Sequence, residues 1–245
     1  MHPFNIIKLP EATSTQVYIT ENDKKNSFGE FTVIYTDCQT HGKGQGTHLW
    51  ESEPHKNISF SFILKPSFIA AQDQFIISQF VSLAIADAVG FYVKQGVKIK
   101  WPNDIYVNQD KICGFLVQNQ IMGNDIYKSY IGIGLNVNQR KFDHAPNPTS
   151  LSLQTGAEYP LEDVLDLLLE KIYMRYMQLK SGSRKALVDE YLSMLLFKGQ
   201  RRQYICSGKK IYATIESVNS FGHVIYRTDD AKEASCELRQ WQFIL

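Results

Sequence analysis

Two stretches of the sequence gather residues that could bind and activate an acid. The first, QTHGKGQGTHLW at residues 39–50, places glycines at alternate positions around Lys43. The second, KWPNDIYVNQDKICG at residues 100–114, places a lysine near each end of a proline turn and a hairpin. Glycine lets the backbone approach an anion and present its N–H groups, while a lysine adds positive charge. Such groups are typical of a phosphate or carboxylate site.

The glycine pattern alone is weakly specific. A dinucleotide fingerprint requires a strand, the glycines and then a helix, whereas this loop joins two predicted strands at 31–37 and 57–64. No Gly-Lys-Ser/Thr follows, so the P-loop is excluded as well, and a flexible loop without function stays open. His41 and His48 flank the glycines, but the six histidines and four cysteines show no metal-ligand spacing, so we predict no protein-bound metal.

Pro102 sets the geometry of the second stretch. Its ring fixes φ and keeps Trp101 extended, so Lys100 leaves a strand while Asn103 and Asp104 emerge from a defined turn. The alternative is that both polar residues only cap the turn and that the tryptophan only fills the core.

Three glycines in neighbouring predicted strands suggest a close approach. Lys111 begins the returning strand of the hairpin, and Gly114 leaves space beside it. Gly132 and Gly134 interrupt a strand that ends near Asn136, and glycine weakens a strand unless something lies close to it. A ligand across these glycines would explain all three.

The elements that must position these residues follow from periodicity and turn signals. A helix over 70–90, with apolar residues at i, i+4 spacing, is expected to pack on a sheet. The further predicted strands cover 97–101, 104–107, 111–118 and 126–138, and further helices cover 160–179 and 184–197. After residue 199, four period-two runs at 203–208, 209–218, 223–228 and 234–241 predict a small β-barrel or meander.

The composition limits the class of protein. With 245 residues, 44% of them hydrophobic, the chain can bury one substantial core and carry a small appendage. The net charge of +1 excludes a globally basic nucleic-acid surface and gives no attraction to an anionic membrane. Cys38, Cys113, Cys206 and Cys236 form no C-x-x-C pair and no signal peptide is evident, so we expect a reduced, cytoplasmic protein. Polar residues interrupt the apolar stretch at 75–93, which predicts a helix and no membrane span.

Together these motifs resemble the biotin protein ligase family, also called biotin–acetyl-CoA-carboxylase ligases. The resemblance rests on STQ at 14–16, the loop at 39–50, KWPNDIYVNQDKICGFLVQ at 100–118 and GIGLNVNQ at 132–139, which follow the family's order and spacing. No winged-helix region precedes these motifs, so we expect the monofunctional class rather than the repressor class.

The resemblance also implies a fold and a reaction. The fold is α+β, a class II synthetase-like mixed sheet flanked by helices over residues 1–196, with a small β-barrel cap over 197–245. Biotin attacks the α-phosphate of ATP to give biotinyl-5′-adenylate and pyrophosphate, with Mg²⁺ held through the ATP phosphates. A lysine of a biotin carboxyl carrier protein or domain then attacks the mixed anhydride. Because two anions must meet, the site needs cations and N–H donors more than a general base.

The matching positions assign roles that the resemblance alone supplies. The biotin site would comprise Ser14, Thr15, Gln39, Gly42, Lys43, Gly114, Gly132 and Gly134, with Ser14, Thr15 and Gln39 on the ureido head. The ATP site would comprise Lys43, Gln45, Trp50, Asn103, Asp104, Lys111 and Asn136. The catalytic groups would be Lys111, which bridges the biotin carboxylate and the α-phosphate, and Lys43.

The glycine loop departs from the family pattern. Relatives commonly carry G-R-G-R/Q-R-G, whereas here Lys43 replaces the first arginine, Gln45 holds the middle place, and Gly46-Thr47 replace the last Arg-Gly. Lysine lacks the bidentate fork of arginine. We therefore expect weaker retention of the adenylate, or greater reliance on Lys111 and Mg²⁺.

Two other functions stay open. A lipoate or octanoate ligase or transferase shares the fold but needs a long apolar tunnel, whereas the polar 14–16 segment and Gln39 suit a ureido ring. A non-enzymatic module could bind nucleic acid through basic residues of the last fifty, Arg201, Arg202, Lys209, Lys210 and Arg227, although mixed charges favour a solvated surface. We expect biotin, ATP and a carrier domain as partners, no nucleic acid or membrane, and a monomer or homodimer.

Overall fold

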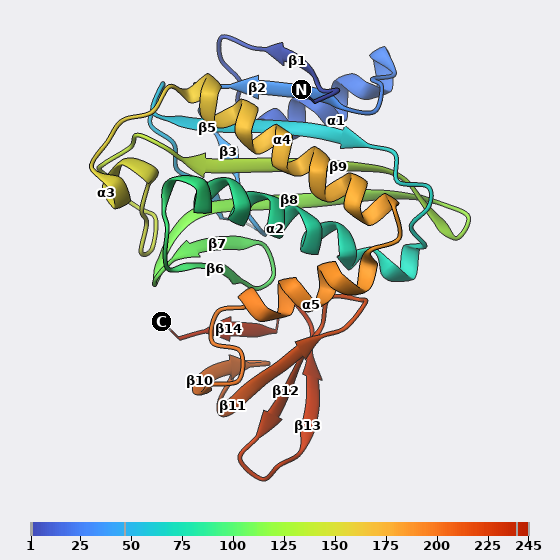
Figure 1. Ribbon diagram of the computed structural model, residues 1–245, viewed down its shortest axis with the longest axis vertical. Coiled ribbons are helices and arrows are strands. Elements are labelled where there is room, and N and C mark those ends of the chain that lie inside the picture. Colours follow the sequence, from blue (N-terminus) through green and yellow to red (C-terminus); the bar gives the residue numbers. More distant parts are fainter. Residues whose placement is uncertain (1, 47, 239, 245) are drawn as a thin grey trace.

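A seven-stranded mixed sheet forms the larger part of the protein, in a computed structural model that describes residues 2–46, 48–238 and 240–244 (Figure 1). Its strand order is β1-β2-β5-β9-β8-β7-β6, with β1 and β2 parallel and all other neighbours antiparallel. The strands are β1 (Asn5–Lys8), β2 (Thr32–Thr36), β5 (Asn57–Leu64), β6 (Val97–Lys100), β7 (Asp104–Val107), β8 (Asp110–Met122) and β9 (Asp125–Asn136). The predicted α+β mixed sheet is confirmed.

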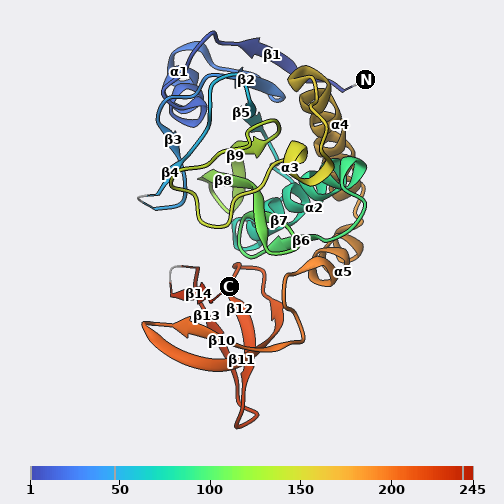
Figure 2. The same ribbon diagram turned by 90° about the vertical axis from the view of Figure 1, so that its left-hand side faces the viewer.

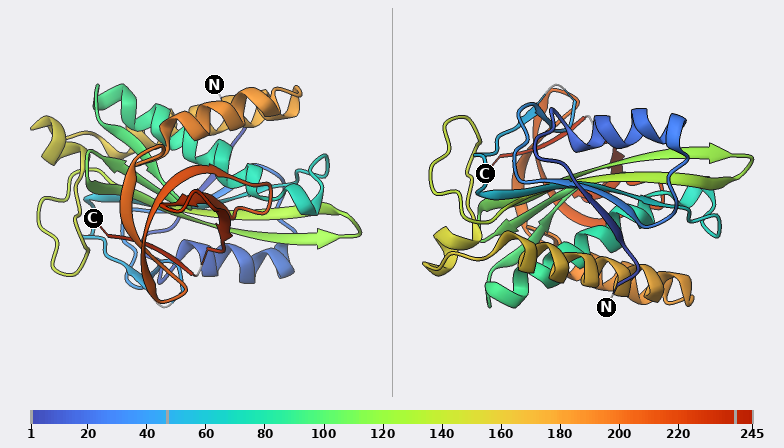
Figure 3. Two further views of the ribbon diagram at one scale, coloured as in Figure 1. Left: turned by 90° about the horizontal axis from the view of Figure 1, so that it is seen from below. Right: turned by 90° about the horizontal axis from the view of Figure 1, so that it is seen from above.

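Helices cover both faces of this sheet, as the view from above shows (Figure 3). On one face α1 packs through Ile19 against Ile34, Ile63 and Tyr130 of the sheet. The opposite face is covered by α2, α4 and α5. The helices are α1 (Thr15–Asn26), α2 (Phe75–Tyr92), α3 (Leu151–Thr155), α4 (Leu161–Lys180) and α5 (Arg184–Met194), with a 3-10 turn η1 (Ala71–Asp73) before α2.

The central helix α2 is more apolar than α1, α4 and α5. The segment Ala71–Tyr92 is long and apolar enough to cross a membrane, but 72% of its apolar window is buried within the molecule. Phe80, Leu83 and Ala84 are fully buried. Burial on this scale is typical of a core helix, whose apolar surface drives folding.

A buried ion pair fixes α1 to the sheet. Asp23 Oδ2 accepts hydrogen bonds from Lys128 Nζ and from the Tyr130 hydroxyl, both at 2.6 Å. At the other end of the helix, Ser14 is the N-cap, and its Oγ accepts from the backbone N–H of Val17. The helix therefore presents its first residues at a defined place on the sheet.

The C-terminal strands form an open sheet, so the predicted barrel is wrong in one respect. The strands are β10 (Arg201–Cys206), β11 (Lys209–Val218), β12 (Val224–Thr228), β13 (Glu233–Cys236) and β14 (Trp241–Phe243), in the order β13-β12-β11-β10-β14. Within the described residues, β13 and β14 are opposite edges that do not pair. The sheet buries Tyr204, Tyr226 and Trp241 on one face. The Trp241 ring centroid lies 4.5 Å from that of Tyr204 and 4.8 Å from that of Tyr226, so the sheet has a small core without closing into a barrel.

The C-terminal sheet lies beneath the β6–β7 end of the larger sheet (Figure 2). The buried Trp101 Nε1 donates to the carbonyl of Gly222 at 3.0 Å. An added Cβ at Gly222 would lie 2.5 Å from the Phe75 ring, so glycine is required for this close approach. The proline turn that the sequence singles out is therefore also a contact point for the C-terminal sheet.

Most predicted elements are present, with shifted ends. Strands β5 and β7 match their predicted bounds, α2 continues past Gly90 to Tyr92, and α5 ends at Met194 rather than residue 197. The predicted strand at 234–241 is two strands, β13 and β14, separated by a turn. Sequence patterns do not predict β1, α1, α3 or the small hairpin of β3 (Gly42–Lys43) and β4 (Leu49–Trp50) inside the glycine loop.

Candidate active site

One cavity of about 820 Å³ gathers the residues that the sequence singles out. It lies between the sheet, the start of α1, the β3–β4 hairpin and the loop that follows β9. Every predicted site residue lines it, namely Ser14, Thr15, Gln39, Gly42, Lys43, Gln45, Trp50, Asn103, Asp104, Lys111, Gly114, Gly132, Gly134 and Asn136. Residues from position 14 to position 136 thus meet in one place.

Polar side chains form one end of the cavity. The backbone N–H of Thr15 donates to Gln39 Oε1 at 2.9 Å, and the Thr15 hydroxyl lies 3.0 Å from Ser61 Oγ. Gln39 Nε2 donates to Ser59 Oγ at 3.4 Å. Because α1 and β5 hold these groups rigidly, the end is preorganised to hydrogen-bond a small polar ring.

Charged side chains form the other end. Lys111 Nζ lies 2.7 Å from Asp104 Oδ1, and Lys100 Nζ lies 3.8 Å from Asp104 Oδ2. Lys100 Nζ is also 5.2 Å from the ring centroids of both Tyr106 and Phe243. Burial lowers the pKa of Lys100, an effect that Asp104 opposes. Since one carboxylate faces two ammonium groups, this wall attracts anions.

The three strand glycines make room for protein side chains. A Cβ at Gly114 would lie 3.1 Å from Lys111 Nζ, and a Cβ at Gly134 would lie 2.5 Å from Trp50 Nε1. A Cβ at Gly132 would lie 2.5 Å from the side-chain oxygen of Gln16. The sequence predicted a ligand across these glycines, and the structure places the functional side chains themselves over them.

Three buried polar atoms in this cavity have no hydrogen-bond partner among the described residues. They are Gln16 Oε1, Trp50 Nε1 and Asn136 Oδ1. A buried polar group without a partner costs about 1–3 kcal/mol, so such groups call for an explanation. A bound ligand with donors and acceptors of its own would satisfy them.

The other predicted residues occupy less central places. Asn103 Nδ2 donates to the backbone carbonyl of Phe115, so the Asn103 side chain ties the turn to β8. The side-chain Oδ1 of Asn103 remains for other contacts. Lys43 and Gln45 are exposed at the rim of the cavity. Thr47, the departure from the family's arginine-rich loop, lies outside the described residues.

Several lining residues escaped the sequence reading. The family resemblance assigns no individual role to Gln16 of the STQ motif, although its side-chain oxygen lies over Gly132. Ser61 is one of three polar residues in the buried strand β5, with Asn57 and Ser59, a signal that alternation could have revealed. Glu51 carries no local signal, because its hydrogen-bond partners lie on a segment distant in sequence.

Comparison with known proteins agrees with this geometry. The model of the biotin/lipoate A/B protein ligase family matches residues 9–136, more than half of the chain. The bifunctional ligase/repressor BirA of Bacillus spizizenii is 32% identical over 159 residues, covering 62% of this chain and 49% of that protein. Biotin–protein ligase 2 of Arabidopsis thaliana is 27% identical over 239 residues, covering 92% of this chain and 70% of that protein. The chain thus matches about half the length of the Bacillus relative.

A solved structure extends the similarity to nearly the whole chain. The biotin protein ligase from Aquifex aeolicus, in complex with biotin and ATP, superimposes with a TM-score of 0.79 at 26% sequence identity and covers 97% of both chains. The match therefore includes the C-terminal sheet as well as the segment that carries the cavity. By motif order, fold and family match, the chain belongs to the biotin/lipoate A/B protein ligase family.

Proposed function

We propose that the protein is an ATP-dependent biotin protein ligase. It forms biotinyl-5′-adenylate from biotin and ATP and transfers the biotinyl group to a lysine of a biotin carboxyl carrier domain. The observation that carries the proposal is one cavity that joins a polar cradle at Thr15 and Gln39 to the Lys111–Asp104 pair. The Aquifex relative, whose structure contains biotin and ATP, supports both substrates.

The cationic wall brings two repelling anions together. Lys111 Nζ faces the cavity from the start of β8, where it can contact the biotin carboxylate and the α-phosphate at once. Its ammonium group lowers the repulsion between the two acids and stabilises the charge that develops as the new P–O bond forms and pyrophosphate leaves. Asp104 holds the lysine in place until the anions arrive. No protein base is needed for this step, because the attacking carboxylate is already ionised.

The polar end selects the vitamin. A ureido ring offers two N–H donors and one carbonyl acceptor, which the carbonyl oxygen of Gln16 and the hydroxyls of Thr15 and Ser61 can pair. A lipoyl or octanoyl chain would leave the buried Gln16 Oε1 without a partner, at a cost that discriminates against it. The polar end therefore favours biotin over the lipoate or octanoate alternative.

Mg²⁺ is proposed to enter with ATP. Among the residues that the structure describes, no cluster of three or more His, Cys, Asp or Glu side chains could hold a metal. Mg²⁺ is commonly held by one or two carboxylates together with phosphates. Asp104 is the carboxylate that fits this role, and the ion would add positive charge around the triphosphate.

We also propose a carrier protein as the second substrate, a cytoplasmic location for the protein, and a division of the chain into two domains. A carrier lysine can reach the adenylate through the open mouth of the cavity, and the four cysteines without disulfides suit a cytoplasmic protein. We assign residues 1–196 to catalysis and 197–245 to a cap, because the two sheets share no strand pairing within the described residues.

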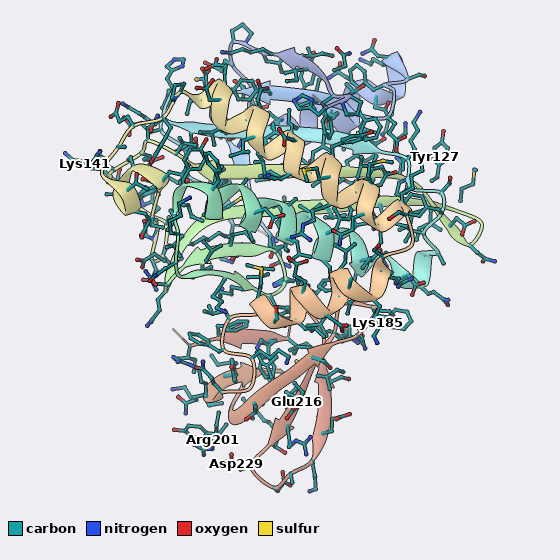
Figure 4. All side chains as sticks on the ribbon, viewed as in Figure 1. Tyr127, Lys141, Lys185, Arg201, Glu216 and Asp229 are labelled. Carbon is teal, nitrogen blue, oxygen red and sulfur yellow. The ribbon has the colours of Figure 1, made fainter. Side chains whose placement is uncertain are left out.

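The basic residues of the C-terminal sheet give little support to nucleic-acid binding. Arg201 forms an ion pair with Asp229 at 2.6 Å and Arg227 forms one with Glu216 at 3.1 Å. Arg201, Glu216 and Asp229 lie together on the outer part of this sheet (Figure 4). Paired charges of both signs do not make a phosphate-binding surface.

Intact-mass analysis of a carrier domain tests the proposal. The protein is incubated with biotin, ATP, Mg²⁺ and the carrier, with a carrier whose target lysine is replaced by arginine as the control. We expect one biotinyl group on the native carrier and none on the control. Octanoate in place of biotin should give no product, and a preference for octanoate, or an unmodified native carrier, would overturn the assignment.

A further inference from the structure

Glu51 joins two segments that border the cavity. It directly follows Trp50 at the end of β4, and its two carboxylate oxygens accept the backbone N–H groups of Asp143, His144 and Ala145 at 2.7, 2.9 and 3.0 Å. Burial raises the pKa of Glu51, but the three N–H donors outweigh it and lower that pKa. The carboxylate is thus charged and held by charge-assisted hydrogen bonds.

Both joined segments line the cavity. On one side, the Trp50 ring lies against Gly134 and 5.6 Å from Lys111 Nζ. On the other side, the loop after β9 contributes further lining residues, Phe142, His144, Ala145, Pro146 and Pro148. Lys141 marks the start of this loop in Figure 4, at the side of the molecule opposite Tyr127.

The middle of this loop depends on Glu51. Its far end is fixed separately, because the N–H of Lys111 donates to the Asn147 carbonyl at 2.6 Å and the N–H of Thr149 donates to the Lys111 carbonyl at 2.8 Å. Its near end is fixed at Gln139, which accepts from the N–H of Glu53 at 2.9 Å. Within the part of the chain that the structure describes, residues 142–146 make no hydrogen bonds other than those to Glu51.

We propose that Glu51 is a positioning residue that clamps the β3–β4 hairpin to the 142–146 loop, so that the two close the cavity as one wall and retain the activated biotin. The inference rests on the proposed ligase function. Retention matters because the mixed anhydride reacts with any nearby amine or with water once it escapes. The hairpin carries few cations of its own, with Lys43 exposed at the rim, so a clamp compensates for weak electrostatic hold.

Two substitutions of Glu51 and one matched control test the clamp. Glu51→Ala removes all three acceptor contacts, and Glu51→Gln keeps one amide oxygen but loses the charge. Glu53→Ala is the control, since Glu53 lies on the same segment, is exposed, and its side chain forms no hydrogen bond or ion pair among the described residues. Melting temperatures identify variants that fold, and Glu51→Gln carries the test if Glu51→Ala is unfolded.

The first measurement needs no substrate. Amide hydrogen exchange at residues 143–145 is compared between the variants and the unaltered protein. Glu51→Ala should accelerate exchange at these amides by about tenfold or more, which corresponds to about 1.4 kcal/mol. Glu51→Gln should lie between, and Glu53→Ala should match the unaltered protein. Equal exchange in Glu51→Ala and Glu53→Ala would overturn the clamp.

The second measurement follows escape of the adenylate. Biotin transferred to a bystander protein without a carrier domain is divided by biotin transferred to the carrier. This ratio should rise severalfold in Glu51→Ala and stay constant in Glu53→Ala, whereas a purely structural loss would lower both products together. An unchanged ratio in an otherwise active enzyme refutes the retention role. If the unaltered protein biotinylates nothing, the proposed function fails instead, and the exchange experiment still decides the clamp.

Discussion

Replacement of Lys111 by alanine is the most direct test of how the site activates its acid. The ammonium group lies 2.7 Å from Asp104 and faces the cavity in which, in the proposed reaction, the biotin carboxylate and the α-phosphate meet. The substitution removes the cation and leaves the Asp104 carboxylate facing two further anions. Both changes raise the barrier for adenylate formation.

The size of the effect follows from the charges. At about 4 Å and an effective dielectric constant near 20, one pair of unit charges interacts by about 4 kcal/mol, or roughly a thousandfold in rate. The Lys111 side chain is 27% exposed, so water screens part of this interaction. We therefore expect adenylate formation to slow by about 10²- to 10³-fold, the range found when an electrostatic stabiliser is removed from an active site.

Pyrophosphate release in the absence of carrier isolates this step. Lys98→Ala is the control, because Lys98 is an exposed lysine of β6 outside the cavity and its loss changes the net charge equally. The double variant Lys111→Ala/Asp104→Asn should regain part of the rate, since it removes the uncompensated carboxylate. If Lys111→Ala stays within about tenfold of the unaltered protein, a loss of roughly 1.4 kcal/mol, the role of Lys111 is wrong.

Three further substitutions test the surroundings of the site. Gly134→Ala places a Cβ against the Trp50 indole, so it should shift tryptophan fluorescence and raise the KM for ATP several-fold. Phe243→Ala removes a ring that lies 5.2 Å from Lys100 Nζ, and so reduces the burial that lowers the pKa of Lys100. The alkaline limb of the KM profile for ATP should therefore move to higher pH. Burial raises the pKa of Asp23, but Lys128 and the neighbouring tyrosine hydroxyl outweigh burial and lower it. The stability that Asp23 contributes is thus present above pH about 4 and is lost as the pH falls through its lowered pKa. Asp23→Asn should destabilise the protein by about 3–5 kcal/mol at neutral pH. In thermal melts of this variant, the melting temperature should depend less on pH in the acid range.

The strands and the central helix could be predicted because their apolar residues are local signals. β5 reads NISFSFIL and α2 repeats apolar positions over 18 residues, so each element reports its own burial. Helix α1 could not be predicted because its apolar residues, Val17, Tyr18 and Ile19, are consecutive rather than at helical spacing, and it buries only Thr15, Ile19 and Asp23. Its position depends on the ion pair with Lys128, 105 residues away, which no sequence window contains.

In the candidate site too, residues that belong to local motifs could be predicted, whereas residues defined by distant contacts could not. The residues named from the family motifs all line one cavity, because the motif order already encodes their roles. Glu51 could not be found this way, since its partners are backbone N–H groups, which every non-proline residue carries. The open C-terminal sheet was also beyond the pattern, because period-two strands fit a barrel and an open sheet equally.

The Lys111–Asp104 pair suggests how the site handles charge before substrate binds. The Lys111 ammonium group would be costly to desolvate if it had no partner, and its ion pair with Asp104 offsets this cost before substrate binds. When an anionic substrate enters, Lys111 exchanges Asp104 for the substrate, so it has an anionic partner throughout. Asp104 keeps Lys100 as its own partner, at 3.8 Å. This exchange requires Asp104 to be the weaker partner. In the absence of Mg²⁺, Asp104→Asn should therefore bind ATP more tightly at low salt, and weaker binding under the same conditions would refute this exchange.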